Sequence, residues 1–480
     1  MNDFTFFWHD YETFGISPRR DRPAQFAGIR TDADLNELGA PVMHYCQPPL
    51  DRLPDPESCL LTGIVPQTCQ ERGLPEHAFA AAIERELAQA GTIGLGYNTI
   101  RFDDEVTRFL FWRNLIDPYA REYKDGCGRW DLLDVLRCTY ALRPDGIQWP
   151  RHDDGRPSFK LEHLSAANGL QHDAAHDALS DVRATLALAR LIKQQQPRLW
   201  DFCLKLRKKD AVLAEIGIGR PFLHISGMYG AERGCLAVVW PLAPHPSNKN
   251  ELIVWDLAHD PAELFALDAA TIRLRLFSKA DDLPEGVTRL PIKTIHLNKS
   301  PVVIANLKTL SAPMAERWGI DMAQALRHAD TAARHGVSMA GIWPEVYERP
   351  ESSAPVDVDE DLYGGFLNDV DRRRLQQLRR LGPDRLAEHH PDFDDPRLAE
   401  LLFRYRARNF PQTLTEPEQQ RWQQHCAARL HDGAGGALTL PAFFERIDTL
   451  GEALTEADEE RGQEILGALY DWAEQIAPVR

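Results

Sequence analysis

The chain contains 480 residues, of which 43% are hydrophobic and 26% are charged, and its formal net charge at pH 7 is −17. This length predicts roughly three domains, and an integral membrane protein is excluded because no apolar run approaches the ~18–20 residues that a bilayer span needs. The negative charge excludes attraction of nucleic acid by the molecule as a whole, so such a partner would need a locally basic groove. The N-terminal residues lack the pattern of an export signal, which predicts a cytoplasmic location.

The eight cysteines are scattered along the chain, and none belongs to a Cys-x-x-Cys or a paired Cys/His spacing. Zinc sites use such spacings. The sequence therefore predicts reduced thiols with structural roles.

Strand and helix patterns alternate in residues 1–200, which predicts a mixed α/β domain. The predicted strands are 4–9, 26–31 and 92–96, and the predicted helices lie near 77–90, 103–115 and 178–194. Between 221 and 304, short β-rich runs such as 235–240 and 252–255 are separated by glycine, proline and asparagine. That pattern is typical of a small barrel or sheet.

The C-terminal part of the chain changes character again. Residues 343–361 contain prolines and the acidic run Asp357-Val358-Asp359-Glu360-Asp361, a composition too polar for a core, which predicts a linker. Residues 362–480 then show helical periodicity, which is clearest in 371–381, 397–409 and 461–476.

The first candidate site is an apolar strand pattern that ends in two acids, Asp10 and Glu12. Because side chains alternate along a strand, these two are predicted to project from the same face. Like charges so close repel each other, and a divalent cation with hard oxygen ligands, Mg²⁺ or Mn²⁺, would compensate them. Two solvated acids at the end of a strand are the simpler alternative.

Two further acidic clusters follow. Asp103-Asp104-Glu105 opens a predicted helix, where acids also complement the helix dipole. Another helix opens before Asp181, and His176 can approach Asp181 only if it lies in the loop before that helix. The same His-x4-Asp spacing occurs at His172 and Asp177, so the spacing alone does not choose between the two pairs.

Together the clusters supply four carboxylates, from Asp10, Glu12, an acid near 103 and Asp181, and the imidazole of His176. Four carboxylates can hold two metal ions roughly 3.5–4 Å apart, which stabilises the attacking and leaving oxygens of a phosphoryl displacement. An imidazole, with an ordinary pKa of roughly 6.5, is suited to take a proton from the attacking water near neutral pH.

Seven motifs stand out along the chain: 9–15 (HDYETFG), 96–106 (GYNTIRFDDEV), 129–135 (RWDLLDV), 175–181 (AHDALSD), 224–228 (HISGM), 295–301 (IHLNKSP) and 405–411 (YRARNFP). They resemble the bacterial exonuclease I family, a branch of the DEDDh 3′-to-5′ exonucleases. The resemblance extends over nearly the whole chain and is weakest near 321–356 and 426–460.

The resemblance implies a ribonuclease-H-like catalytic domain over 1–200, a Src-homology-3-like barrel over 201–350 and a helical domain over 356–480. It implies that two Mg²⁺ ions, for which Mn²⁺ can substitute, are bound by Asp10, Glu12, Asp103 and Asp181, and that the general base is His176. Asp104, Glu105, His172 and Asp177 are then left with supporting or structural roles. Glu12 and Lys160 would contact the terminal nucleotide, and Lys160 stands where the family often has arginine, which loses a bidentate contact with phosphate.

A single strand is held by cations that neutralise phosphates and by aromatic side chains that stack on bases. The family-matching segments predict DNA contacts from Arg108, Tyr119, Tyr123, Arg137, Lys209, Asn298, Lys299 and Ser300. Arg404 and Arg408, one helical turn apart, are further candidates. The resemblance also implies that Arg143 and Arg317 bind the acidic, phenylalanine-ended tail of single-strand-binding protein.

The expected function is processive, Mg²⁺-dependent 3′-to-5′ hydrolysis of single-stranded DNA to 5′-mononucleotides, in DNA repair and recombination, by a monomer. Two alternatives stay open. One is a 3′-to-5′ exoribonuclease of the same family, because discrimination against a 2′-hydroxyl leaves no short motif. The other is a non-catalytic single-strand-binding scaffold whose acids coordinate a structural ion.

Overall fold

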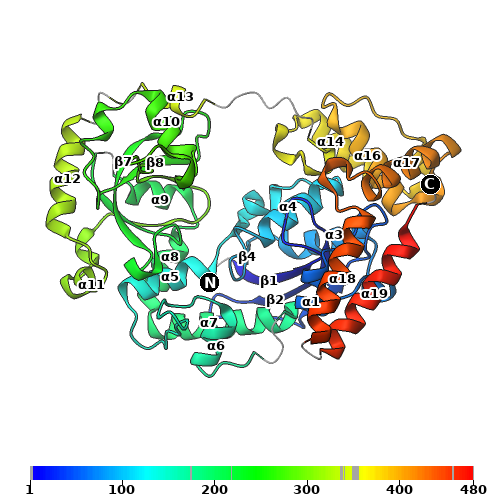
Figure 1. The fold of residues 1–480 in the computed structure, drawn as a ribbon, viewed down its shortest axis with the longest axis horizontal. Helices are drawn as coiled ribbons and strands as arrows, with labels where there is room; N and C mark the ends of the chain where they lie inside the picture. Colours follow the sequence, from blue (N-terminus) through cyan, green and yellow to red (C-terminus); the bar gives the residue numbers. More distant parts are fainter. Residues whose placement is uncertain are drawn as a thin grey trace. The chain divides into compact units, whose positions relative to one another are not determined.

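The structure, a computed structural model, describes residues 4–172, 176–217, 219–335, 339, 341–348, 356–456 and 459–478. It divides into two compact units (Figure 1). The first unit comprises 1–128, 172–183 and 354–480, and the second comprises 129–171 and 184–353.

The first unit is built on a mixed five-stranded sheet with the order β3-β2-β1-β4-β5. Its strands are β1 (Thr5–Thr13), β2 (Pro23–Thr31), β3 (Val42–Tyr45), β4 (Thr92–Leu95) and β5 (Gly128–Arg129). The three predicted strands are confirmed, and β1 is longer than expected because it continues through both acids. β1 pairs antiparallel with β2 along this whole length, so the acids lie within a strand and not beyond its end.

Helices pack on this sheet through a shared aromatic and aliphatic cluster. Phe7 and Phe26 of the sheet are buried against Phe79 and Leu110 of the helices, as their apolar spacing predicts. The helices of this part are α1 (Pro56–Thr62), α2 (Pro66–Arg72), α3 (Glu76–Leu87), α4 (Asp103–Arg113) and α7 (Ala178–Gln195), which continues into the second unit. The helices predicted near 77–90, 103–115 and 178–194 are confirmed.

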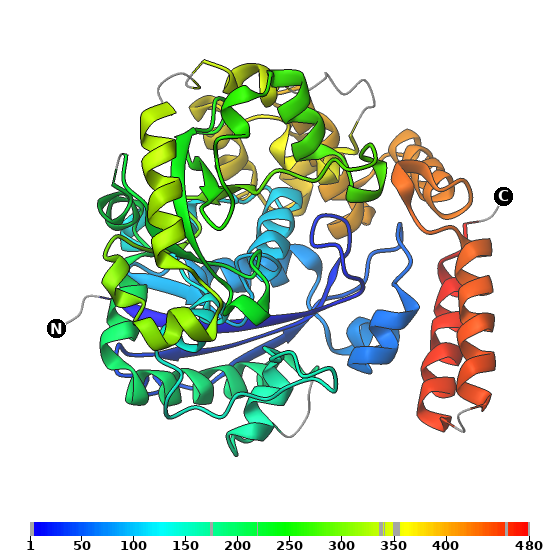
Figure 2. The same cartoon turned by 60° about the vertical axis from the view of Figure 1, so that its left-hand side comes forward.

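The C-terminal helices belong to the first unit and share its hydrophobic cores. Trp112 of α4 packs in one cluster with Leu401, and Phe14 packs in another with Trp472. The last two helices of the chain run side by side as a hairpin (orange and red, Figure 2). These helices are α14 (Asp369–Leu378), α15 (Pro383–Glu388), α16 (Arg397–Asn409), α17 (Glu416–Leu430), α18 (Leu440–Glu456) and α19 (Glu460–Ile476).

The acidic run is not a linker, so the linker prediction was wrong for these residues, whereas 349–355 lie outside the described residues. Val358–Glu360 forms a short 3₁₀ helix, and Asp359 is completely buried. Four arginines compensate its charge, which is why so polar a segment can enter a core. They are Arg22, Arg404, Arg408 and Arg429.

We call the residues of this network the buried ionic cluster: Arg22, Asp51, Asp357, Asp359, Arg404, Arg408 and Arg429. Arg404 and Arg408, which the sequence suggested as DNA contacts, belong to it. The two side chains are only 10% and 5% exposed and are paired with carboxylates, so they fasten α16 to the acidic run and are not available to phosphates.

The second unit contains an antiparallel, curled sheet with the order β10-β6-β7-β8-β9, as the β-rich pattern predicted. Its strands are β6 (Phe222–Ile225), β7 (Leu236–Pro244), β8 (Glu251–Asp256), β9 (Ile292–His296) and β10 (Val302–Ile304). Its helices are α5 (Leu132–Leu142), α6 (Leu161–Ala167), α8 (Pro197–Lys205), α9 (Lys209–Glu215), α10 (Ala269–Phe277), α11 (Ala312–Arg317), α12 (Met322–His335) and α13 (Trp343–Val346).

All eight cysteines lie in the described part of the chain and are free thiols, as predicted, and all except Cys127 are buried. Within the ranges given above, none of the helices combines the length and the apolar character that crossing a bilayer would require.

Candidate active site

The site begins where β1 loses one of its two neighbours. β4 pairs with β1 only as far as Trp8, opposite Leu95, so the next residues of β1 have a free edge on that side. The backbone N–H of Tyr11 donates to the Asp103 carboxylate at 3.0 Å instead of to a strand. Gly96 makes this departure possible, because a Cβ there would lie 2.4 Å from the carbonyl oxygen of His9.

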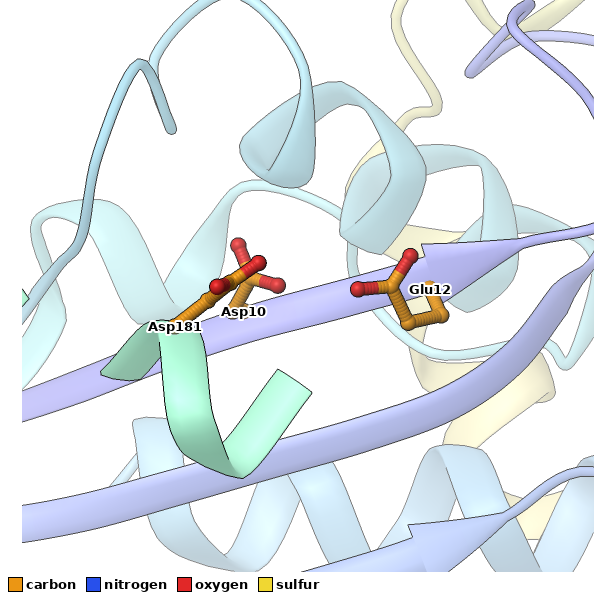
Figure 3. A group of neighbouring side chains, drawn as sticks. All are labelled: Asp10, Glu12 and Asp181. Atoms are coloured by element: carbon orange, nitrogen blue, oxygen red, sulfur yellow. The ribbon is translucent and has the colours of Figure 1, made fainter. Parts of the chain in front are cut away.

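Three carboxylates converge beside this free edge (Figure 3). One oxygen from each of Asp10, Glu12 and Asp181 lies within 4.8 Å of the others, and we call these three residues the carboxylate cluster. Asp10 and Glu12 share a face of β1, as the strand period predicted, and Asp181 comes from the first turn of α7. The convergence of segments about 170 residues apart in sequence is what the family resemblance implied.

The start of α7 is fixed by contacts to the sheet. Asp177 accepts a hydrogen bond from the backbone N–H of Ser180 at 3.1 Å, so it caps the N-terminus of the helix. Gln25 of β2 donates to Asp177 at 3.1 Å and accepts from the N–H of Ala178 at 3.0 Å. These contacts hold the first turn of the helix against the strand beside β1, which places Asp181 over the acids.

The electrostatics of the carboxylate cluster demand a counter-charge. Burial raises the pKa of Asp10 well above its usual range, and Asp103, Glu12 and Asp181 raise it further. Burial together with Asp181 and Asp177 raises the pKa of Glu12 to about 8. Without a cation, these acids therefore resist ionisation, and a divalent ion would remove the penalty.

Asp103 is the acid of the second cluster that faces Asp10, a choice the spacing left open. It is buried and is the second-largest cause of the raised pKa of Asp10, after burial. Its neighbours are engaged elsewhere: Asp104 is paired with Arg121 at 2.6 Å, and Glu105 with Arg108 at 2.8 Å. Asp103 lies beside the carboxylate cluster but outside the group that shares the 4.8 Å limit.

The two histidines of the third cluster have different surroundings. His176 lies in the loop before α7, as expected, with a left-handed φ of 65°. His172 places its Nε2 atom 2.5 Å from Oδ1 of Asp181. The sequence left His172 with a supporting or structural role and did not predict this contact. Residues 173–175 lie outside the described residues.

The DNA-contact candidates of the first unit are Arg108, Tyr119 and Tyr123. This guanidinium is buried and bonded to Glu122 at 2.7 and 2.8 Å, so its charge is already matched. It also lies 5.2 Å from the ring of Tyr119. Tyr123 is largely exposed, and so is Phe366, an aromatic that the sequence reasoning missed and whose ring packs against Tyr119.

In the second unit, Arg137 lines a polar cleft of about 630 Å³ and pairs with Asp134 at 2.7 Å. Lys160 is exposed next to Glu162, and Lys209 donates to Asn250 at 2.7 Å. The predicted 298–300 segment is a turn between β9 and β10. Asn298 is exposed there, Lys299 is half-buried, and Ser300 is buried and donates to the carbonyl of Arg129 at 3.3 Å.

The two partner-binding candidates lie in different surroundings. Arg143 follows α5 and lines a cavity of about 410 Å³ together with Leu142, Phe202 and Ile304. Arg317 is exposed on α11, where it lies over the rings of Tyr140 and Trp318, and it is not among the residues that line this cavity.

Comparison with known proteins places this geometry in a family. Three family models match in succession: Exonuclease over 7–189, Exonuclease I SH3-like domain over 207–349 and Exonuclease I C-terminal domain over 356–476. They agree with the expected α/β catalytic, Src-homology-3-like and helical domains.

Relatives match over almost the full length. Exodeoxyribonuclease I of Escherichia coli is 44% identical over 99% of this chain and 100% of its own length. Exodeoxyribonuclease I of Haemophilus influenzae is 46% identical over 90% of this chain and 92% of its own length. Exonuclease I of Methylocaldum szegediense gives a TM-score of 0.93 at 48% identity, over 98% of this chain and 99% of its own. The structure of E. coli exonuclease I with a dA16 oligonucleotide gives a TM-score of 0.94 at 43% identity, over 99% of this chain and 100% of its own. The chain therefore belongs to the exonuclease I family.

Proposed function

We propose that this chain is a processive 3′-to-5′ exodeoxyribonuclease that degrades single-stranded DNA to 5′-mononucleotides. The observation that carries the proposal is the convergence of Asp10, Glu12 and Asp181 beside buried Asp103. Structures of E. coli exonuclease I with dA16 and with 5cy-dT13 support a single DNA strand as the substrate.

The donor set fits divalent metal ions. All its members are carboxylate oxygens, which suit Mg²⁺ and Mn²⁺, and the pKa values of Asp10 and Glu12 are raised by burial and then by the neighbouring acids. Asp10, Glu12 and Asp181 would hold the ion nearest the attacking water, with Asp10 and Asp103 supporting a second one. Two such ions, when bound, would stabilise the attacking and leaving oxygens of the displaced phosphate. A zinc-bound E. coli relative supports metal binding in the family.

His176 would act as the general base. Its position directly before the cap of α7 brings its charge close enough to affect the pKa of Asp181. A neutral imidazole there would take the proton of the water that attacks the terminal phosphodiester, and the 3′-oxygen of the preceding nucleotide would leave. The product is then a 5′-mononucleotide.

The strand would be gripped by aromatic faces and cations spread over the three domains. Exposed Tyr123 and Phe366 offer faces for base stacking, and exposed Lys160 offers a charge to the terminal phosphate. The other proposed contacts are Tyr119, Arg137, Lys209, Asn298, Lys299 and Ser300. Because Arg108 is already paired with Glu122, we assign it to positioning Tyr119 under the strand.

We also propose that the cavity beside Arg143 binds the tail of single-strand-binding protein. Its lining is mostly apolar, which suits a terminal phenylalanine, while Arg143 offers a charge to the carboxylate. A structure of single-strand-binding protein with exonuclease I supports this partner. Arg143→Ala should weaken binding of a labelled tail peptide more than tenfold and Arg317→Ala should weaken it less; unchanged binding in Arg143→Ala would refute the site.

An enzyme that removes single strands from a 3′ end suits DNA repair and recombination, and we propose that role for a cytoplasmic monomer. The activity is tested with matched DNA and RNA oligonucleotides, each labelled at the 3′ or the 5′ end, with and without a chelator. We expect DNA to be shortened from its 3′ end to mononucleotides, RNA to persist, and the chelator to stop the reaction.

Asp10→Ala is the control for contaminating nucleases and should be inactive. RNA degraded as fast as DNA would favour the exoribonuclease, and the absence of any product would favour a binding scaffold. To test processivity, excess unlabelled strand is added after the first turnovers; continued shortening of the labelled strand is the expected result.

A further inference from the structure

His172 makes a close contact with the carboxylate cluster that the proposed mechanism does not use. Its Nε2 atom lies 2.5 Å from Oδ1 of Asp181, and the two side chains are only 7% and 18% exposed. Within the described residues, His172 precedes α7 by six positions, so it reaches Asp181 across the loop that carries His176. The contact therefore joins the loop to the first turn of the helix.

This contact would restrict the orientation of the Asp181 carboxylate. An aspartate side chain rotates about two bonds, and a hydrogen bond to one oxygen fixes the plane in which the other oxygen lies. The backbone N–H of His176 also bonds to this carboxylate, and both contacts lower the pKa that burial raises. Two donors from one loop thus hold the only member of the carboxylate cluster that does not come from β1.

We propose that His172 is a positioning residue that holds Asp181 ready to ligate a divalent cation. Ligands of metal ions are commonly oriented by hydrogen bonds from residues behind them, and loss of such a partner typically lowers metal affinity 10–100-fold. This inference rests on the proposed function. It separates the two histidines, since His172 orients a ligand and His176 moves a proton.

The test is calorimetric titration of Mn²⁺ alone into the full-length chain without DNA. In His172→Ala, the dissociation constant for Mn²⁺ should rise about 10–100-fold. His172→Gln should retain most of the affinity, because its amide nitrogen reaches the place of Nε2, whereas the shorter His172→Asn should not. Exposed His390 provides the control, and His390→Ala should bind Mn²⁺ normally.

Turnover adds a second readout. At saturating Mn²⁺, kcat of His172→Ala should stay close to that of the unchanged chain, while the Mn²⁺ concentration for half-maximal rate rises in step with the dissociation constant. Affinity that is unchanged or tighter in His172→Ala would overturn the proposal, since a tighter site would mean that the imidazole competes with the cation.

The outcomes also separate this inference from the proposed function. If the unchanged chain bound no Mn²⁺, the proposed function would fail. If the unchanged chain bound Mn²⁺, Asp10→Ala did not, and His172→Ala bound it with normal affinity, only the role of His172 would fail. If circular dichroism shows that His172→Ala does not fold, the Mn²⁺ affinities of His172→Gln and His172→Asn are compared instead. Equal affinities in these two variants would overturn the role of His172.

Discussion

His176 combines an unusual backbone with a central position. Its φ of 65° lies in the left-handed region, which a residue other than glycine adopts at a cost of about 1–2 kcal/mol. The cap at Asp177 and the bonds to Gln25 follow directly and hold this conformation in place. A strained residue beside converging carboxylates is the arrangement expected of a group that acts in catalysis.

For His176→Ala we expect kcat to fall by about 10²–10⁴ at saturating Mg²⁺, the usual loss when a general base is removed. Affinity for single-stranded DNA and for Mn²⁺ should stay close to normal. Single-turnover degradation and binding of a labelled oligonucleotide measure these effects. Normal turnover in His176→Ala would contradict the assignment.

Glu12 makes stability depend on pH. Its pKa is raised from 4.5 to about 8 by burial and then by Asp181 and Asp177, so the folded chain keeps a proton that the unfolded chain releases. Without metal, folding stability therefore falls as pH rises from about 4.5 to 8. A glutamine at this position has no carboxyl group to ionise, so it would not cause this loss of stability as the pH rises.

We predict that Glu12→Gln, in the presence of a chelator, raises the free energy of unfolding at pH 8 by about 2–4 kcal/mol, since one pKa unit is worth about 1.4 kcal/mol. Near pH 4 the difference should vanish. Urea denaturation at the two pH values measures it. If the variant were no more stable at pH 8, Glu12 would not be held protonated in the absence of metal.

At the level of elements, the acidic run and α16 are joined by the buried ionic cluster. Burial by itself raises the pKa of Asp359, but Arg408 and Arg22 outweigh this effect and hold the pKa well below its usual range. Arg408 contacts Asp359 at 2.5 Å and Asp51 at 2.8 Å, so one arginine bridges two buried acids. Removing a buried acid leaves an arginine charge without its partner, and removing an arginine leaves a buried carboxylate without its partner.

Asp359→Asn should lower the free energy of unfolding by about 3–5 kcal/mol, because breaking a buried pair leaves uncompensated charge. The matched control is Asp369→Asn, whose pair with Arg372 is exposed and screened by solvent, so its removal should leave the free energy of unfolding nearly unchanged. Urea denaturation at pH 7 measures the free energy of unfolding of both variants and of the unchanged chain. The Asp359 contribution should disappear as pH falls below about 3.8, where the unfolded chain binds a proton first.

Local patterns were sufficient for most elements and for two of the three members of the carboxylate cluster. The period of β1 predicted that Asp10 and Glu12 share a face, and apolar spacing predicted α4 and α16. The burial of Asp359 was not predictable from its own segment, because the compensating Arg22 is 337 positions away. The same holds for His172, because its contact with Asp181 does not follow from the spacing of the two residues along the chain.

At the scale of the whole molecule, the C-terminal helices complete the core around the catalytic sheet. Trp112 donates to the carbonyl of Val358 at 2.8 Å and packs with Leu401, and Phe14 packs with Trp472. Removing 356–480 would expose these large apolar side chains of the catalytic part. The limits of 1–200, 201–350 and 356–480 therefore do not describe three independent cores, and their exact ends stay a prediction.

We predict that a chain ending at residue 355 does not unfold cooperatively and binds a hydrophobic dye, as loosely packed states do. Circular dichroism during heating, with the full chain as reference, measures this. A cooperative transition at the midpoint of the full chain would show that the helices are not required. Processivity is therefore better tested in the full chain than in this truncation.

We expect the carboxylate cluster to bind the divalent cations of a nuclease. Crystals of the full chain soaked in Mn²⁺ and measured at the manganese absorption edge would reveal such ions. An anomalous peak is expected at about 2.0–2.3 Å from oxygens of Asp10, Glu12 and Asp181, and no such peak in Asp10→Ala. No peak beside these residues, in crystals whose protein still degrades single-stranded DNA with Mn²⁺, would contradict it.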